Sequence, residues 1–211
     1  MARKISEIRR PEIVRGLYEA IRKNGISLPG YGQVAEAGEM TRQLIRHYFV
    51  EPEQLAIALC DHLASTYRDS LMKGIIEAGD SLRLSTFLDF YFDFLADRGL
   101  AKPRDDAVYD ALFALASTSE PVRTRLRDQY SLLQMTLAHE IQISYPQLPQ
   151  NGCRELGYLI VALMYGHWKM VATLGFSETN NVVSRQAIDR LIESYVAGYD
   201  DPDLWPVGKP V

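Results

Sequence analysis

The chain has no run of 18 apolar residues and only two cysteines, Cys60 and Cys153, among its 211 residues. The first absence argues against a transmembrane helix, which needs about 20 apolar residues. The second argues against a disulfide framework, because both cysteines lie in stretches with helical periodicity. The first ten residues, MARKISEIRR, are charged and lack the apolar segment of a secretory signal. We therefore expect a cytoplasmic protein.

Motifs for catalysis and metal binding are also missing. His139-Glu140 lacks a second histidine at the zincin spacing, where Ile143 stands instead. Gly30-Tyr31-Gly32 lacks the remainder of a dinucleotide or phosphate loop, and no Gly-x-Ser-x-Gly elbow occurs. The cysteines do not have metal-ligand spacing. We expect no catalytic residues, no metal and no cofactor, although a small-molecule enzyme on a helical fold stays an alternative.

Charge is distributed unevenly along the chain. Residues 1–49 hold nine Lys/Arg and five Asp/Glu, a net charge of +4, whereas the remainder holds 14 and 22, a net charge of −8. A basic N-terminal part on an acidic body is typical of a protein that contacts a polyanion with one end. Random surface charge is the alternative interpretation.

Helical periodicity dominates the sequence, and no strand-like alternation of useful length occurs. We predict an all-α fold of nine to ten helices. The expected ranges are 10–24, 31–37, 42–48, 52–78, 82–97, 105–117, 120–145, 152–174 and 184–198. Three prolines in residues 199–211 predict a loosely ordered tail.

The segment Val34–Leu55, VAEAGEMTRQLIRHYFVEPEQL, carries the clearest functional signal. It predicts a short helix, a tight turn, a second short helix capped by Thr41, and a long amphipathic helix that starts at Pro52. This order is that of the helix-turn-helix in DNA-binding regulators. We therefore expect a DNA-binding domain in residues 1–49 and a larger domain in residues 50–198.

The same segment resembles the N-terminal signature of the TetR family of transcriptional regulators. The matching positions are Val34-Ala35, Gly38-Glu39-Met40-Thr41, Phe49, Pro52 and Leu55. Further along, Leu163-Met164-Tyr165-Gly166-His167-Trp168 and Leu174-Gly175-Phe176 resemble the BetI-like subgroup of that family. The resemblance implies a three-helix helix-turn-helix domain followed by a larger helical domain for ligand binding and dimerisation.

Three positions depart from the family pattern. Glu39 stands where the family has its turn glycine; because glutamate disfavours the left-handed conformation, we expect Gly38 to adopt it instead. Gly30 replaces a capping serine or threonine, and Pro52 replaces a lysine. Both changes remove expected phosphate contacts. They motivate an alternative, a protein-interaction protein whose degraded helix-turn-helix no longer binds DNA.

Polar residues of the second short helix are the candidates for reading DNA. Arg42 or Arg46 could pair with guanine and Gln43 with adenine, while the resemblance implies that Tyr48 bonds a phosphate. Alternatively, the arginines form surface ion pairs and Tyr48 packs in the core. The predicted DNA-binding residues are Thr41, Arg42, Gln43, Arg46, His47, Tyr48, Arg9 and Arg10, the last two as contacts to the backbone or minor groove.

Two long helices, Glu120–Tyr145 and Gly152–Leu174, are apolar on more than one face and must be buried. By resemblance they form a dimer interface; a purely intramolecular core is the alternative. The predicted interface residues are Leu133, Leu137, Leu156, Leu159, Ile160 and Leu163.

Aromatic residues are frequent in the larger domain. Most suit plain core packing, but a subset could enclose a cationic, choline-like effector through cation–π attraction. The predicted pocket residues are Phe87, Tyr91, Phe94, Tyr109, Phe113, Tyr130, Tyr165 and Trp168. We therefore expect a homodimeric, ligand-responsive transcriptional repressor. It would bind a roughly palindromic double-stranded DNA operator and be released by a small-molecule effector of unknown identity.

Overall fold

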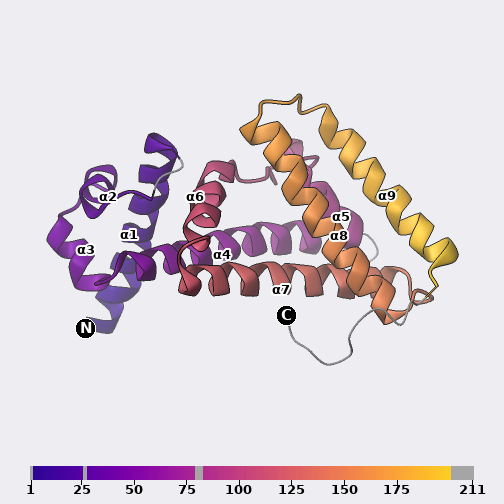
Figure 1. The fold of residues 1–211 in the computed structure, drawn as a ribbon, viewed down its shortest axis with the longest axis horizontal. Coiled ribbons are helices and arrows are strands. Elements are labelled where there is room, and N and C mark those ends of the chain that lie inside the picture. The colour runs from indigo at the N-terminus through magenta and orange to yellow at the C-terminus, as the bar shows by residue number, and fades with distance from the viewer. Residues whose placement is uncertain (1, 26–27, 79–82, 201–211) are drawn as a thin grey trace. The chain divides into compact units, whose positions relative to one another are not determined.

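The computed structural model describes residues 2–25, 28–78 and 83–200. These ranges are helical and contain no strand, which confirms the prediction of an all-α fold (Figure 1). The helices are α1 (Ala2–Asn24), α2 (Tyr31–Ala37), α3 (Arg42–Tyr48), α4 (Pro52–Ala78), α5 (Arg83–Tyr91), α6 (Asp106–Ala116), α7 (Glu120–Ser144), α8 (Gln150–Trp168) and α9 (Asn180–Gly198), with a 3-10 turn at Ala96–Arg98 and a π-helical turn at Lys169–Thr173. The predicted tail lies mostly outside the described residues.

Helices α2, α3 and α4 have the predicted limits, but α1 begins eight residues earlier than expected. Pro11 therefore lies inside α1 and not in its first turn. Residues 2–10 contain good helix formers such as alanine, arginine, lysine and glutamate. Their helical propensity outweighs the backbone hydrogen bond that Pro11, which has no N–H, cannot donate to the Glu7 carbonyl.

Helix α5 ends at Tyr91, six residues before the predicted limit. The chain turns there because Asp93 adopts the left-handed conformation, with a φ of 61°. The Phe94 N–H donates to the Asp89 carbonyl over 2.9 Å, which closes the end of the helix. Likewise, α8 ends at Trp168 and continues only as the π-helical turn.

Contacts between residues divide the chain into two compact units. The first unit comprises Met1–Ser70 and Pro103–Gln129, and the second comprises Leu71–Lys102 and Tyr130–Val211. Helices α4 and α7 each contribute residues to both units. The predicted boundary between a DNA-binding domain in residues 1–49 and a larger domain in residues 50–198 differs from this division and stays a prediction.

The first unit holds the three N-terminal helices around one apolar core. Ile13, Leu17, Ile45 and Phe49 are all at most 1 % exposed. The same unit contains α6, which contacts α1, and the start of α7. The Ser119 hydroxyl bonds the Glu53 carboxylate of α4 over 2.5 Å. Helices of the predicted larger domain therefore pack in one unit with the helix-turn-helix.

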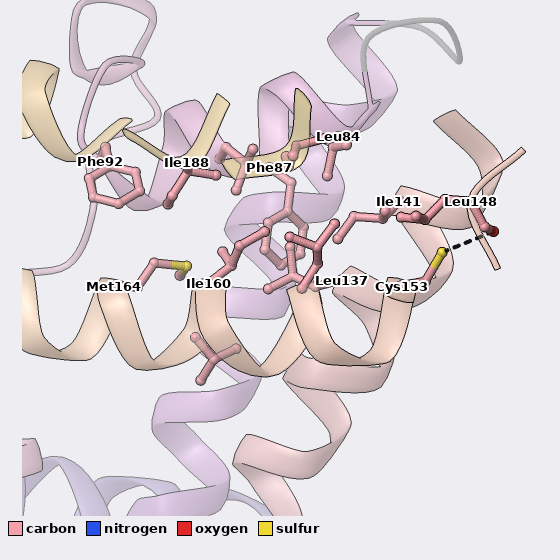
Figure 2. Close-up of a cluster of buried hydrophobic side chains, with 14 residues drawn as sticks. Leu84, Phe87, Phe92, Leu137, Ile141, Leu148, Cys153, Ile160, Met164 and Ile188 are labelled. Carbon is pink, nitrogen blue, oxygen red and sulfur yellow. Dashed lines mark hydrogen bonds between the residues drawn. The ribbon is translucent and has the colours of Figure 1, made fainter. Parts of the chain in front are cut away.

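The second unit is built around a cluster of apolar side chains from α5, α7, α8 and α9 (Figure 2). Figure 2 shows Phe87 of α5 and Ile188 of α9 over the side of α8 that carries Ile160. These side chains are at most 1 % exposed, so solvent is excluded from this part of the core. Glu140 is also buried, and the Arg83 guanidinium neutralises it with two hydrogen bonds of 3.1 and 2.6 Å.

Candidate nucleic-acid interface

Helix α3 presents a polar face to solvent, as the sequence predicted. Its four exposed positions in the described structure are Arg42, Gln43, Arg46 and His47. Ile45 on the other side is fully buried. The predicted cap is present, because the Thr41 hydroxyl accepts a hydrogen bond from the Leu44 N–H over 3.2 Å. Thr41 therefore stabilises the N-terminus of the helix that carries the exposed face.

The turn before α3 differs from the expectation. Glu39, not Gly38, adopts the left-handed conformation: φ is 50° at Glu39 and −96° at Gly38. The Met40 N–H bonds the Ala35 carbonyl, and the Glu39 N–H bonds the Glu36 carbonyl. These two bonds form a Schellman motif, in which the left-handed position falls at Glu39. The prediction for Gly38 was wrong because the bonding pattern sets this position, and residue preference does not.

Gly38 is needed for a different reason, which is close packing against α1. A Cβ atom at Gly38 would lie 3.3 Å from the Gly16 Cα and 3.3 Å from the Val34 carbonyl oxygen. Both contacts are with backbone, which cannot move aside easily. The glycine therefore allows α1 to approach the turn.

Two side chains from other helices hold the C-terminal end of α3. Arg10 of α1 donates to the Tyr48 carbonyl over 2.9 Å, and its guanidinium lies 4.2 Å from the centre of the Phe49 ring. The Tyr31 hydroxyl of α2 donates to the Phe49 carbonyl over 2.8 Å. Arg10 was predicted as a DNA contact, but the structure gives its guanidinium an intramolecular role. Tyr31 was not predicted, and no short motif marks it.

Burial raises the pKa of Tyr31, and the Glu51 carboxylate raises it further, whereas the Arg46 guanidinium lowers it. The hydroxyl is therefore protonated at neutral pH and able to donate. Arg9 and Tyr48 complete the predicted set. Arg9 pairs with Glu12 over 2.7 Å on the surface of α1. Tyr48 is half-buried, with its ring centre 5.0 Å from that of His47.

A groove of about 410 Å³ runs between α1 and the turn before α3. Its charged lining residues are Arg9, Glu12, Arg15, Glu19 and Glu39. Three carboxylates against two guanidinium groups make it unsuited to a polyanion. The exposed side of α3 is the better candidate for contact with DNA.

The predicted pocket aromatics fall into different environments. Tyr109 and Phe113 belong to the first unit and the other six to the second. Phe87 is 1 % exposed and part of the apolar core, and its assignment to a pocket stays a prediction. Phe94 is 42 % exposed. Single-sequence patterns do not separate these environments, because all of them favour aromatic residues.

Trp168 is held from two sides within the second unit. Its indole N–H donates to the Tyr91 carbonyl over 2.9 Å. The Lys102 ammonium lies 4.1 Å from the centre of its ring, and Lys102 is only 7 % exposed. The cation–π interaction expected for an effector is thus already made by the chain's own lysine.

A buried polar group lies next to Trp168. His167 bonds the Asn181 side-chain oxygen and the Ser184 hydroxyl, each over 2.9 Å. The Asn181 amide donates to the Phe92 carbonyl over 3.1 Å. Both ring nitrogens are therefore engaged in joining α8 to α9 and to the end of α5.

The predicted dimer residues also divide into groups. Leu137, Leu156 and Ile160 are 0 % exposed within one chain. Their assignment to the interface was wrong, because a side chain that is already fully buried has no surface to offer a partner. Leu133 and Leu159 are half-buried, and Leu163 is 46 % exposed. Periodicity could not separate the two sides of a helix that is apolar nearly all round.

Two features are absent from residues 2–25, 28–78 and 83–200. No group of three or more His, Cys, Asp or Glu side chains there is arranged to hold a metal ion. No helix there is long and apolar enough to cross a membrane.

The architecture defines an all-helical protein with an N-terminal helix-turn-helix. The sequence matches no protein-family model. It is 25 % identical over 174 residues to the transcriptional regulator BetI of Escherichia coli. The matched region covers 81 % of this chain and 86 % of that relative.

Solved structures agree with this similarity. A transcriptional regulator from Rhodococcus has a TM-score of 0.69 at 15 % identity and covers 90 % of this chain and 96 % of its own. A regulator from Saccharomonospora viridis, solved in complex with choline, has a TM-score of 0.68 at 17 % identity, with coverages of 87 % and 95 %. The chain is thus similar to BetI over most of its length and has the fold of these transcriptional regulators.

Proposed function

We propose that the protein is a repressor that binds a roughly palindromic operator as a homodimer and is released by a small-molecule effector. The exposed polar face of α3 carries the proposal. Thr41 caps the start of this helix, while Arg10 and Tyr31 hold its end. A helix held at both ends can present its side chains to a major groove without losing much conformational freedom on binding.

Dimerisation is supported by exposed apolar side chains on α8, on α9 and in the segment between these helices. Tyr158, Leu163 and Val183 are 58 %, 46 % and 58 % exposed. The further members are Met170, Leu174, Phe176 and Val182. Exposed apolar side chains that gather on neighbouring helices mark an interaction site, and an isologous contact would pair them with their copies. The half-buried Leu133 and Leu159 would lie at its margin.

The effector is proposed to bind in residues 50–198. The neighbour from Saccharomonospora viridis binds choline, a quaternary ammonium ion. In this chain the Trp168 ring already carries the Lys102 ammonium. A cationic effector that uses this ring would have to compete with Lys102. Choline is therefore the first ligand to test, and Lys102→Met, which has similar volume without charge, is the informative variant.

Helix α6 and the first parts of α4 and α7 lie in one compact unit with the helix-turn-helix, and this arrangement supports coupling between effector and DNA. Within the first unit, the Tyr67 hydroxyl of α4 bonds Asp105, just before α6, over 2.9 Å. Arg125 of α7 pairs with Asp61 of α4. A shift of α4 would therefore strain its bonds to the start of α6 and to α7, and α6 in turn contacts α1. The energy available is the effector's differential affinity for the two states, typically about 1–3 kcal/mol.

The test is a gel shift on the region upstream of the protein's own gene, at two salt concentrations and with nonspecific competitor. We expect a salt-sensitive, sequence-selective shift. The Arg42→Ala/Arg46→Ala double variant should lose it. Arg154→Ala, which removes an exposed arginine of α8, is the matched control and should retain it.

Three other outcomes would contradict the proposal. A folded dimer that retards neither this region nor any duplex selected from a random library would favour an interaction protein with a degraded helix-turn-helix. Chemical turnover of a bound ligand would favour an enzyme. Selective binding that no ligand weakens would remove the effector from the proposal.

A further inference from the structure

The exposed face of α3 is divided into two stripes by its packing against α2. Arg42 lies on α2: a Cβ atom built on Gly32 would be 2.8 Å from Arg42 Nη2, 3.1 Å from Cζ and 3.2 Å from Nε. The whole guanidinium group therefore covers the Gly32 backbone. No hydrogen bond or ion pair of this group occurs among the described residues, so its donors are available to another molecule.

Arg46 lies on the same side of α3. It follows Arg42 by one helical turn, and its guanidinium lowers the pKa of Tyr31, the neighbour of Gly32 on α2. Two arginines thus line the edge of α3 that faces the first turn of α2. This placement rests on packing, and the sequence alone does not distinguish it from any other exposed position.

Gln43 and His47 form the second stripe. At about 100° per residue, Arg42 and Arg46 lie within about 40° of each other, and so do Gln43 and His47. The centres of the two pairs are about 100° apart around the helix axis. All four side chains are exposed. Gln43 and His47 therefore lie about 100° farther around α3 than the arginines, which line the edge facing α2.

We infer that Gln43 and His47 read the base edges, whereas Arg42 and Arg46 contact the phosphate backbone; this inference rests on the proposed function. When a helix-turn-helix docks, the recognition helix enters the major groove and the preceding helix crosses the backbone. The α2 edge of α3 is then nearest to the phosphates. The stripe of Gln43 and His47, about 100° farther around α3, is then nearest to the bases.

The chemistry of each stripe suits its assignment. A glutamine amide can donate to and accept from adenine at N6 and N7. An imidazole N–H can donate to a purine N7. The arginines, which the sequence suggested as guanine readers, supply charge and several donors to phosphate oxygens. Gly32 is a positioning residue, because any side chain there would displace the Arg42 guanidinium.

The test measures two properties of single-alanine variants in the full-length protein. Affinity is measured over a range of salt concentrations, and base preference by selection from an operator library. Arg42→Ala and Arg46→Ala should each lower the slope of log K against log salt by about 1 and leave base preference unchanged. Gln43→Ala and His47→Ala should leave the slope unchanged and relax preference at single base pairs by roughly 5- to 150-fold.

Gly32→Ala tests the positioning role. We expect it to weaken binding, and the Gly32→Ala/Arg42→Ala double variant to bind like Arg42→Ala alone, because the glycine acts through the arginine. Thermal unfolding checks that each variant folds; alanine favours the helix at this position.

Suppose that the wild type binds its operator selectively. Altered base preference in either arginine variant, or additive losses of affinity from the substitutions at positions 32 and 42, would then overturn the inference. Absence of any selective binding by the wild type would instead overturn the proposed function, and the inference with it.

Discussion

Gly16 of α1 and Gly38 of the turn lie directly against each other: a Cβ atom on either glycine would be 3.3 Å from the Cα atom of the other. Gly16 is also close to the Val34 carbonyl oxygen, 3.2 Å from such a Cβ atom. The pair therefore sets the distance between α1 and the helix-turn-helix. A methyl group added to either glycine would push the backbone of α1 away from the backbone of the turn.

Gly16→Ala should accordingly lower the free energy of unfolding by about 1 kcal/mol, since overpacking costs roughly 1–3 kcal/mol and better helix propensity offsets part of it. Chemical denaturation measures the change. Gly166→Ala is the matched control, because no atom lies within 4 Å of the added group. The control should be neutral or stabilising by up to about 1 kcal/mol. Equal effects at both sites would show that the close approach does not matter.

Glu39 stores conformational strain at the same turn. With its φ of 50°, it has a conformation that glycine adopts without steric cost. Glu39→Gly should raise the free energy of unfolding by roughly 0.5–1 kcal/mol, because relief of about 1–2 kcal/mol of strain exceeds the entropy that glycine loses. Glu39→Ala removes the carboxylate but keeps the Cβ atom and should be nearly neutral. A gain of stability in the alanine variant would instead implicate the charge.

Local signals in the sequence predicted the elements of this region well. Pro52 and its apolar stripe defined α4, and Thr41 marked the cap of α3, because both effects act over one or two helical turns. The contact between Arg10 and Tyr48 spans 38 positions and leaves no local pattern. Leu156 illustrates a second limit, since an apolar helix position does not reveal whether its own core or a partner covers it.

Arg10 is expected to affect stability before it affects DNA binding. Arg10→Ala removes the hydrogen bond to the Tyr48 carbonyl and the contact with the Phe49 ring. The free energy of unfolding should fall by roughly 1–2 kcal/mol. Arg9→Ala, one residue away, breaks only an exposed ion pair with Glu12 and should change it by less than about 0.5 kcal/mol. Thermal and urea unfolding compare the two variants. A fully stable Arg10→Ala variant with reduced operator affinity would return Arg10 to the DNA contacts.

Cys60 of α4 should be unreactive in the native protein. Burial, with a smaller contribution from the Asp61 carboxylate, raises the pKa of its thiol from the ordinary 9.0 to about 12. Because the folded pKa is the higher one, the associated stability is complete below pH 9 and is lost as the pH rises toward 12. Alkylation with iodoacetamide should therefore be slow below pH 9 and fast in concentrated urea. Rapid labelling of Cys60 in the folded protein would show that α4 opens locally.

The proposed dimer surface on α8 and α9 can be tested by placing charge on it. Leu163→Glu and Val183→Glu should each shift the protein from twice the chain mass of 23.9 kDa to the monomer in sedimentation. Each carboxylate would be buried in an apolar interface, where an unpaired charge costs several kcal/mol. Operator affinity should fall more than about tenfold as a result, because a monomer engages one half-site. Met72→Glu is the control, since Met72 is 49 % exposed on α4. Met72→Glu should leave the dimer intact. If Met72→Glu dissociates the dimer, or if Leu163→Glu and Val183→Glu both remain dimeric, the interface lies on a different surface.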